Sequence, residues 1–155
     1  MERYRLLHQK DAGRATRSKR SFDLMHEWIR SRHGALCEAR REGGAVAFML
    51  LVLYETGAFY GSACRDPDSE VTAPHLLQWK SILWLKKQGF DYYDLGLQTF
   101  GPQWFDIPSE KEIGISKYKR GFGGVTVPLH VAEYFYSKDV RDQWLGQRFG
   151  RLRSP

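Results

Sequence analysis

The sequence predicts an α/β fold with a mixed sheet, and the spacing of its strand-like segments carries most of that prediction. Three such segments, at residues 35–41, 45–54 and 58–64, are separated from one another by only three residues. Turns this short join antiparallel strands, so these segments predict an antiparallel meander. A helix-length segment then leads to a further strand-like segment at 90–97, and a helical crossover joins strands that run parallel.

An amphipathic helix is expected directly before the meander. Apolar residues recur there at three- and four-residue spacing over 22–32, and Ser21 is the expected N-cap. Within the meander, the residues at 42–44 supply the positive φ angles of a tight reversal. The nearly continuous apolar run at 45–54 predicts a central strand that is covered on both faces.

The crossover helix is expected between a cap at Thr72 and a stop at Gly89. One face of this helix is expected to carry the apolar residues Leu76, Trp79 and Leu83. Trp84 does not share that face, because it stands five residues after Trp79, and it is expected in the core.

The segment after residue 97 is less regular. A loop rich in Gly, Pro and aromatic residues is expected over 99–108, followed by a short helix at 110–120. Residues 125–131 predict a strand, which Pro128 restricts to an edge or bulged position. A final helix is expected within 138–149.

A chain of 155 residues suggests one domain, expected at 21–150 between a basic leader at 1–20 and a tail at 151–155. The leader holds seven Lys or Arg against two acidic residues, and so carries most of the net charge of +6. No apolar stretch approaches the ~20 residues of a membrane span, and two cysteines provide neither a disulfide framework nor a four-thiolate metal site. The expectation is a cytoplasmic protein with no metal and no transmembrane segment.

The segment at 114–124 concentrates the residues that suggest chemistry, because the sequence has no phosphate loop, dinucleotide fingerprint, zinc-protease motif or nucleophile elbow. Three cations, Lys117, Lys119 and Arg120, stand there directly before three of its four glycines, at 121, 123 and 124. The pattern is typical of a helix C-terminus, where cations offset the helix dipole and glycine accepts a positive φ. It equally suits a ligand site in which Lys119 or Arg120 presents positive charge to a carbonyl oxygen or phosphate.

Two motifs resemble the C-terminal acyltransferase domain of the Fem-type (FemAB-like) proteins that form peptidoglycan bridges. The first is YYDLG at 92–96, and the second is ISKYKRGFGG at 115–124. The residues PHLLQW at 74–79 in the crossover helix, and GGAVA at 43–47 where the central strand begins, also fit that family. The resemblance covers residues 21–137 and implies a GNAT-like fold, in which the strands at 58–64 and 91–97 splay to admit an acyl donor.

The resemblance also implies an activity, which is the transfer of an acyl or aminoacyl group to an amine acceptor. Fem proteins use aminoacyl-tRNA and extend the peptide of a cell-wall precursor, and related proteins are thought to use acyl-CoA. The donor would be a co-substrate, and no tightly bound cofactor is implied. The coenzyme A loop of ordinary GNAT proteins, Gln/Arg-x-x-Gly-x-Gly/Ala, is absent before the helix at 72–88.

The family's catalytic cation matches Lys119, which would stabilise the negative charge that develops on the carbonyl oxygen. No protein base is implied, since catalysis in the family is described as largely substrate-assisted. Tyr60 either hydrogen-bonds the reacting group or packs, and Asp94 either orients the amine or Lys119 or caps the following loop. The other residues expected to bind donor or substrate are Tyr118, Arg120, Gly121, Phe122, Gly123, Gly124, Gly96, Trp104 and Gln78.

Fem enzymes carry two GNAT-like domains, whereas this chain has room for one. It would therefore be a fragment of a longer protein, a stand-alone relative, or half of a homodimer that rebuilds the pair. The rival hypothesis is a non-catalytic binding or assembly module that uses the basic leader at 1–20 to hold an acidic partner.

Overall fold

The computed structural model describes residues 1–70, 72–102, 107–130 and 132–152, and the chain divides into two compact units, Met1–Gly96 and Leu97–Pro155. The first unit contains α1 (Glu2–Ala12), α2 (Lys19–Arg30), β1 (Gly34–Arg41), β2 (Gly44–Tyr54), β3 (Gly57–Arg65), α3 (Ala73–Gln88) and β4 (Tyr92–Asp94). The second unit contains α4 (Glu110–Arg120) and α5 (Lys138–Leu152).

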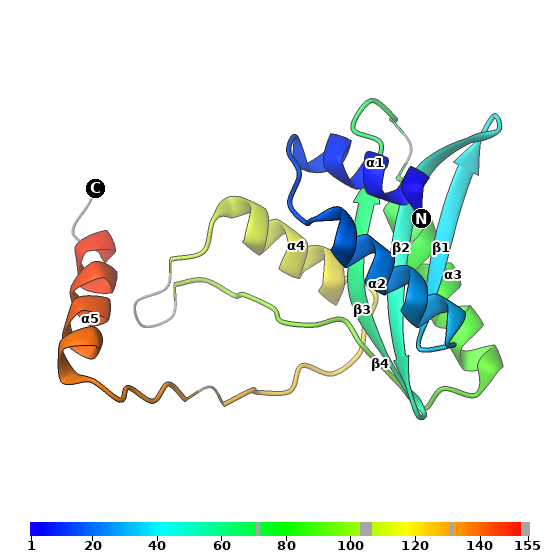
Figure 1. The fold of residues 1–155 in the computed structure, drawn as a ribbon. Helices are drawn as coiled ribbons and strands as arrows, with labels where there is room; N and C mark the ends of the chain where they lie inside the picture. Colours follow the sequence, from blue (N-terminus) through cyan, green and yellow to red (C-terminus); the bar gives the residue numbers. More distant parts are fainter. Residues whose placement is uncertain (71, 103–106, 131, 153–155) are drawn as a thin grey trace. The chain divides into compact units, whose positions relative to one another are not determined.

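The sheet of the first unit has the strand order β1-β2-β3-β4 (Figure 1). β2 pairs antiparallel with β1 and with β3, whereas β3 and β4 run parallel. The two-residue turn between β1 and β2 has φ of 51° at Glu42 and 84° at Gly43, as a hairpin with a primed turn requires. The predicted α/β fold, with its antiparallel meander, helical crossover and parallel pair, is confirmed.

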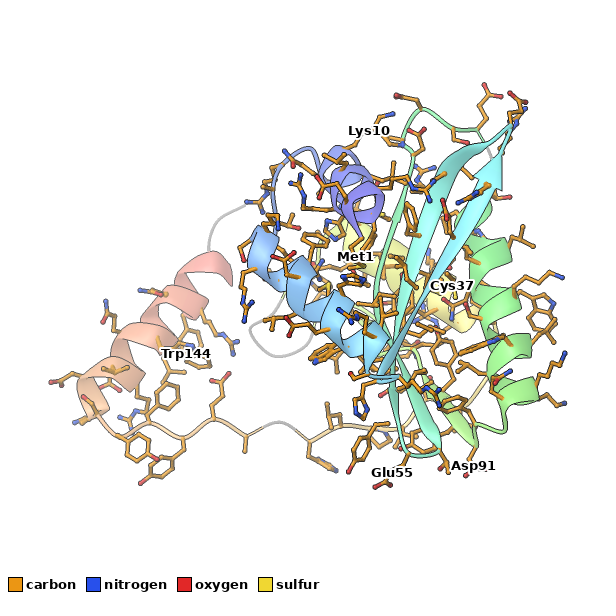
Figure 2. The ribbon with its side chains drawn as sticks, turned by 45° about the vertical axis from the view of Figure 1, so that its right-hand side comes forward. Met1, Lys10, Cys37, Glu55, Asp91 and Trp144 are labelled. Carbon is orange, nitrogen blue, oxygen red and sulfur yellow. The ribbon has the colours of Figure 1, made fainter. Side chains whose placement is uncertain are left out.

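Helices cover both faces of this sheet. α1 and α2 lie in front of it in Figure 1 and α3 lies behind it, and the turned view of Figure 2 separates the two layers. Phe48 and Leu50 of β2 are buried on the side of α1 and α2, while Met49 and Leu51 are buried on the side of α3. The central strand is thus covered on both faces, as its apolar run predicts.

The segment expected as a basic leader is part of the packed unit. Tyr4 of α1 is 0% exposed, and its ring lies 5.4 Å from Phe22 and 5.7 Å from Phe48. The carboxylate of Asp11 accepts a hydrogen bond from the backbone N–H of Arg65 at 3.1 Å. The prediction of a leader outside the fold is therefore wrong for residues 2–12. The charge count gives no sign that Tyr4 belongs to the core.

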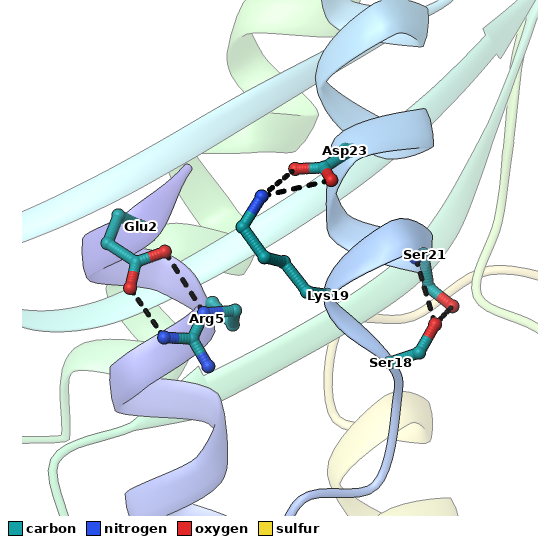
Figure 3. Close-up of polar contacts among 6 residues, drawn as sticks. All are labelled: Glu2, Arg5, Ser18, Lys19, Ser21 and Asp23. Carbon is teal, nitrogen blue, oxygen red and sulfur yellow. Dashed lines mark hydrogen bonds and ion pairs between the residues drawn. The ribbon is translucent and has the colours of Figure 1, made fainter.

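α2 begins three residues earlier than predicted. Ser18, in extended backbone, is its N-cap, and its Oγ accepts from the backbone N–H of Ser21 at 3.3 Å (Figure 3). The expected cap at Ser21 is therefore wrong, since this residue lies inside the first turn. An ion pair between Lys19 and Asp23 at 3.1 Å follows along the same helix.

The face of α3 that packs on the sheet is not the face that carries its largest apolar residues. Its buried residues are Ala73, Leu77, Gln78, Ser81 and Leu85. Leu76, Trp79 and Leu83 point to solvent, and Trp84 is 37% exposed rather than buried in the core. The predicted end of this helix is confirmed at Gly89, which has φ of 83°.

Two predicted strands differ from the structure. β4 is restricted to 92–94 because the chain turns immediately afterwards. Residues 125–130 form no strand, since no described strand pairs with them and Pro128 has no N–H to donate, while Val131 lies outside the described residues. The helix at 110–120 is confirmed, and α5 extends the expected final helix to Leu152, into the expected tail.

Candidate active site

The parallel pair formed by β3 and β4 is the candidate donor site of the first unit. The pairing joins only residues 57–59 to residues 92–94. β3 then runs on to Arg65, and among the described residues no strand pairs with 61–64 on the side of β4, while the backbone N–H of Arg65 is bonded to Asp11. A strand edge without a partner offers its N–H and C=O groups to a ligand. The two strands therefore form the splayed pair that the sequence predicts.

A β-bulge lies in β3 just after the last residue that pairs with β4. Leu51 faces Tyr60 and Leu50 faces Ser62, which leaves Gly61 as an extra residue in β3. A bulge bends its strand and increases the local twist, and bulges are frequent next to active sites. The bulge thus marks the point at which β3 loses its parallel partner.

Tyr60, Gln78 and Tyr93 lie on the α3 side of this splayed pair. Both tyrosines pack against the core beneath α3. Gln78 is 1% exposed, and its Nε2 donates to the Tyr93 hydroxyl at 3.0 Å. Its Oε1 is buried and has no hydrogen-bond partner in the described part of the chain. A buried acceptor without a donor costs about 1–3 kcal/mol, so this amide suits a ligand that brings an N–H group.

Burial raises the pKa of both tyrosines above the usual value near 10, in the case of Tyr60 to about 12. A phenol with so high a pKa stays protonated at neutral pH and therefore acts there as a hydrogen-bond donor. Sequence reasoning missed Tyr93, although strand alternation, which turns Tyr92 outward and Tyr93 inward, was the available signal.

Replacement of Tyr60 by phenylalanine should reduce the sensitivity of the fold to alkaline pH. Because the pKa is raised on folding, protonated Tyr60 contributes stability that is complete below pH 10 and is lost as the pH rises to about 12. Tyr60→Phe should therefore remove about 2 kcal/mol of the wild-type loss over this interval. Urea unfolding at a series of pH values measures the difference, and identical pH profiles for the two proteins would contradict it.

Asp94 is used locally as a cap. Its Oδ1 accepts a hydrogen bond from the backbone N–H of Gly96 at 2.6 Å, and Gly96 has φ of 75°. A side-chain acceptor of this kind closes an Asx turn, which ends β4. Of the two roles expected for Asp94, the capping role is the one that the first unit displays.

In the second unit, the last turn of α4 is joined to the segment 97–100. Lys119 is 9% exposed, and its Nζ donates to the backbone carbonyl of Leu97 at 2.8 Å. The backbone N–H of Thr99 donates to Ser116 Oγ at 2.8 Å. The candidate cation is thus held in a fixed position within its own unit, on a helix whose N-terminus is closed by a capping box between Ser109 and Glu112.

Arg120 makes two weaker contacts with the same segment. Its guanidinium lies 4.5 Å from the centre of the Phe100 ring, which is a cation–π distance, and its Nη1 is 3.4 Å from Gln98 Oε1. Arg120 therefore helps to hold the segment 97–100 against the last turn of α4, next to Lys119.

The remaining residues of the motif form the end of α4. The rings of Tyr118 and Phe122 meet edge to face at 5.1 Å. Gly121 has φ of −60°, which any residue adopts, whereas Gly123 and Gly124 have φ of 79° and 91°. Only the last two glycines thus meet a conformational requirement for glycine. Trp104 lies outside the described residues.

Cys64 should resist thiol reagents in the folded protein. It is buried on the α1 side of β3, and burial raises its pKa to about 12. Thiolate is the reactive species, so alkylation of Cys64 at pH 8 should be on the order of a thousandfold slower than in urea. A Cys37→Ser variant isolates this thiol, and equal rates in buffer and in urea would contradict the prediction.

The described residues include neither a membrane-spanning helix nor a cluster of metal ligands. No helix there is long and apolar enough to cross a bilayer. No group of three His, Cys, Asp or Glu side chains there is arranged to hold a metal ion.

Comparison with known proteins gives matches in structure alone. No protein-family model and no curated protein sequence matches the chain. A ribosomal-protein-alanine N-acetyltransferase from Brucella melitensis biovar Abortus 2308 superposes with a TM-score of 0.58 at 14% identity, over 86% of this chain and 92% of that protein. The fold is a GNAT fold.

Two aminoglycoside 6'-N-acetyltransferases have the same architecture. AAC(6')-IG from Acinetobacter haemolyticus aligns with a TM-score of 0.55 at 15% identity, over 88% of this chain and 91% of that one. AAC(6')-Iy, solved with the bisubstrate analogue CoA-S-monomethyl-acetylneamine, aligns with a TM-score of 0.57 at 16% identity, over 88% and 90%. At these identities the likeness establishes the GNAT fold alone.

Proposed function

We propose that this protein transfers an acyl or aminoacyl group from an activated donor to an amine, with the donor lying along the edge of β3 beside β4. The observation that carries the proposal is the short pairing of these strands, at 57–59 and 92–94, within a GNAT fold. In the reaction the amine nitrogen bonds to the donor's carbonyl carbon, the C–O or C–S bond of the donor breaks, and the amine's proton passes to the leaving group.

Tyr60 is proposed as the donor of a hydrogen bond to the reacting group. It is the first residue of β3 beyond the paired segment, and its raised pKa keeps the hydroxyl protonated. Gln78 Oε1, the buried acceptor on the same side of the sheet, would accept from an amide N–H of the donor. Tyr60 would thus supply a hydrogen-bond donor where the pairing ends, and Gln78 an acceptor beside the paired residue Tyr93.

Lys119 is proposed as the cation that stabilises the oxyanion, as its match to the Fem-type motif implies. A charge in a largely buried position acts more strongly than one in water, because the local dielectric constant is lower. Its bond to the carbonyl of Leu97 supports the proposal by fixing the ammonium before the reaction. A preorganised cation needs little rearrangement as charge develops.

Two donors are proposed, aminoacyl-tRNA and acyl-CoA, and the segment between β3 and α3 bears on the choice. A loop that binds phosphate uses backbone N–H groups at a helix N-terminus. Here Pro74 removes one of these N–H groups, and Asp66, Asp68 and Glu70 bring negative charge close by. Lys10 pairs with Asp66 at 2.6 Å and with Asp68 at 2.8 Å. This composition favours a donor that places no phosphate at the start of α3.

The resemblance further suggests a cell-wall precursor peptide as the amine acceptor, and a second GNAT-like domain or a homodimer as the complete enzyme. The rival binding module is less favoured, because it depends on a basic leader that is available to an acidic partner. Tyr4 holds that segment in the core, and Lys10 is engaged by carboxylates of the same unit.

A transfer assay tests the proposal. The full chain is incubated with a panel of acyl-CoAs or aminoacyl-tRNAs and with amine acceptors, including a pentapeptide that carries a lysine side chain. We expect the acceptor's mass to increase by that of the acyl group with one donor class. Donor consumption that does not depend on the acceptor, or no transfer from either class, would overturn the proposal.

A further inference from the structure

The outer face of α3 carries an apolar stripe that no other described residue of the first unit covers. Leu76, Trp79 and Leu83 are 53%, 50% and 44% exposed. Their spacing of three and four residues places them on one line along the helix, opposite Leu77, Ser81 and Leu85, which face the sheet. A helix that is apolar on both sides is typical of one that is covered on both sides.

The charges on α3 itself have a single sign. Residues 72–90 contain three lysines, Lys80, Lys86 and Lys87, all of which are exposed, and no aspartate or glutamate. α2, on the other face of the sheet, provides a comparison within the same unit. It exposes Trp28 and Leu24 to a similar degree, but Asp23 and Glu27 stand among them.

We propose that the outer face of α3 docks on an anionic lipid surface. Leucine and tryptophan enter the boundary between headgroups and acyl chains, and lysines beside them contact the lipid phosphates while their stems lie along the apolar layer. Each lysine near such a surface strengthens binding roughly fivefold. The proposal is independent of the transferase activity, since it uses no residue of the candidate active site.

The same face suits other occupants less well. A nucleic acid would attract the lysines but would bury neither Leu76 nor Leu83 in an apolar layer. A second copy of the chain, packed through this face, would bring six lysines together with no carboxylate from either helix to offset them. The combination of apolar stripe and positive flanks fits an anionic bilayer.

Vesicle sedimentation tests the proposal with the full chain. The protein is mixed with vesicles of phosphatidylcholine alone, or of equal parts phosphatidylcholine and phosphatidylglycerol, and the bound fraction is measured at low and high salt. We expect binding to the anionic vesicles that weakens with salt. Conversion of Lys80, Lys86 and Lys87 to glutamine should weaken it on the order of a hundredfold. Replacement of Trp79 and Leu83 by serine should weaken it about twentyfold.

The matched control is the pair Leu24→Ser and Trp28→Ser on α2, which should leave vesicle binding unchanged. Because all the substituted side chains are exposed, circular dichroism should show native folding in every variant. Absence of binding to anionic vesicles would overturn the proposal, as would equal losses from the α3 and α2 variants. A dimer in sedimentation velocity that the Trp79 and Leu83 substitutions dissociate would instead assign this face to a second copy.

Discussion

Replacement of Lys119 by methionine should lower kcat for acyl transfer by on the order of a hundredfold to a thousandfold, because one fixed oxyanion donor is lost. KM for the donor should change little, since the cation acts on charge that develops in the transition state. Steady-state kinetics with the donor identified in the transfer assay measure both constants. The same change removes the bond to the Leu97 carbonyl, so thermal unfolding must be compared in parallel.

Lys117 provides the matched control for this prediction. It lies on the same helix, two residues earlier, and its side chain is exposed. Lys117→Met should therefore retain wild-type kcat, and Lys119→Arg should recover part of the lost activity because it keeps the positive charge. Equal kcat in wild type and Lys119→Met would remove this lysine from the mechanism, and equal losses at both positions would point to a general effect of charge.

Replacement of Tyr4 by alanine should destabilise the first unit by about 3–5 kcal/mol, which is the range for truncating a large buried aromatic side chain. Tyr4 is fully buried between α1 and the sheet, and its ring meets both Phe22 and Phe48. Its loss would open a cavity at the point where α1 joins the core. Urea unfolding of the full chain, followed by far-ultraviolet circular dichroism, measures the change.

Leu6 is the control on the same helix, because it is 52% exposed. Leu6→Ala should alter the free energy of unfolding by less than about 1 kcal/mol, as surface substitutions generally do. If Tyr4→Ala lowered the free energy of unfolding no more than Leu6→Ala does, α1 would not contribute to the core. The basic segment would then be a leader outside the fold.

Prediction from sequence succeeded where local signals and packing agree. In the turn at 42–43, Gly43 suits the φ of 84° that it adopts, and β2 is apolar on both faces because helices cover both. The helix at 110–120 has a capping box at its start and cations in its last turn. In each case the local pattern and the tertiary environment favour the same structure.

Prediction failed where the decisive contact is distant in sequence. Tyr4 is one aromatic residue in a basic segment, and only the fold shows that Phe22 and Phe48 meet it. The sequence predicts a strand at 125–131, but a strand needs a partner, and none of the described strands provides one for 125–130. On α3, the sequence predicts Trp84 in the core, whereas this residue is 37% exposed and smaller residues such as Ala73 and Ser81 face the sheet.

The sequence names Tyr60, Gln78 and Lys119 as candidate site residues. The structure adds Tyr93 as the hydrogen-bond partner of Gln78 and Leu97 as the partner of Lys119. A backbone carbonyl such as that of Leu97 leaves no mark in a sequence. The capping role of Asp94 was an open alternative, which the bond to Gly96 supports.

Amide hydrogen exchange in the presence of a non-reactive analogue of the acyl donor is the most direct test of the donor site. If the donor lies along β3 beside β4, saturation with the analogue should slow exchange within residues 61–64, whose edge has no partner strand among the described residues. Protection should be weak at 66–70, where the carboxylates lie. An analogue that binds without slowing exchange within 61–64 would contradict a donor site at the splayed strands.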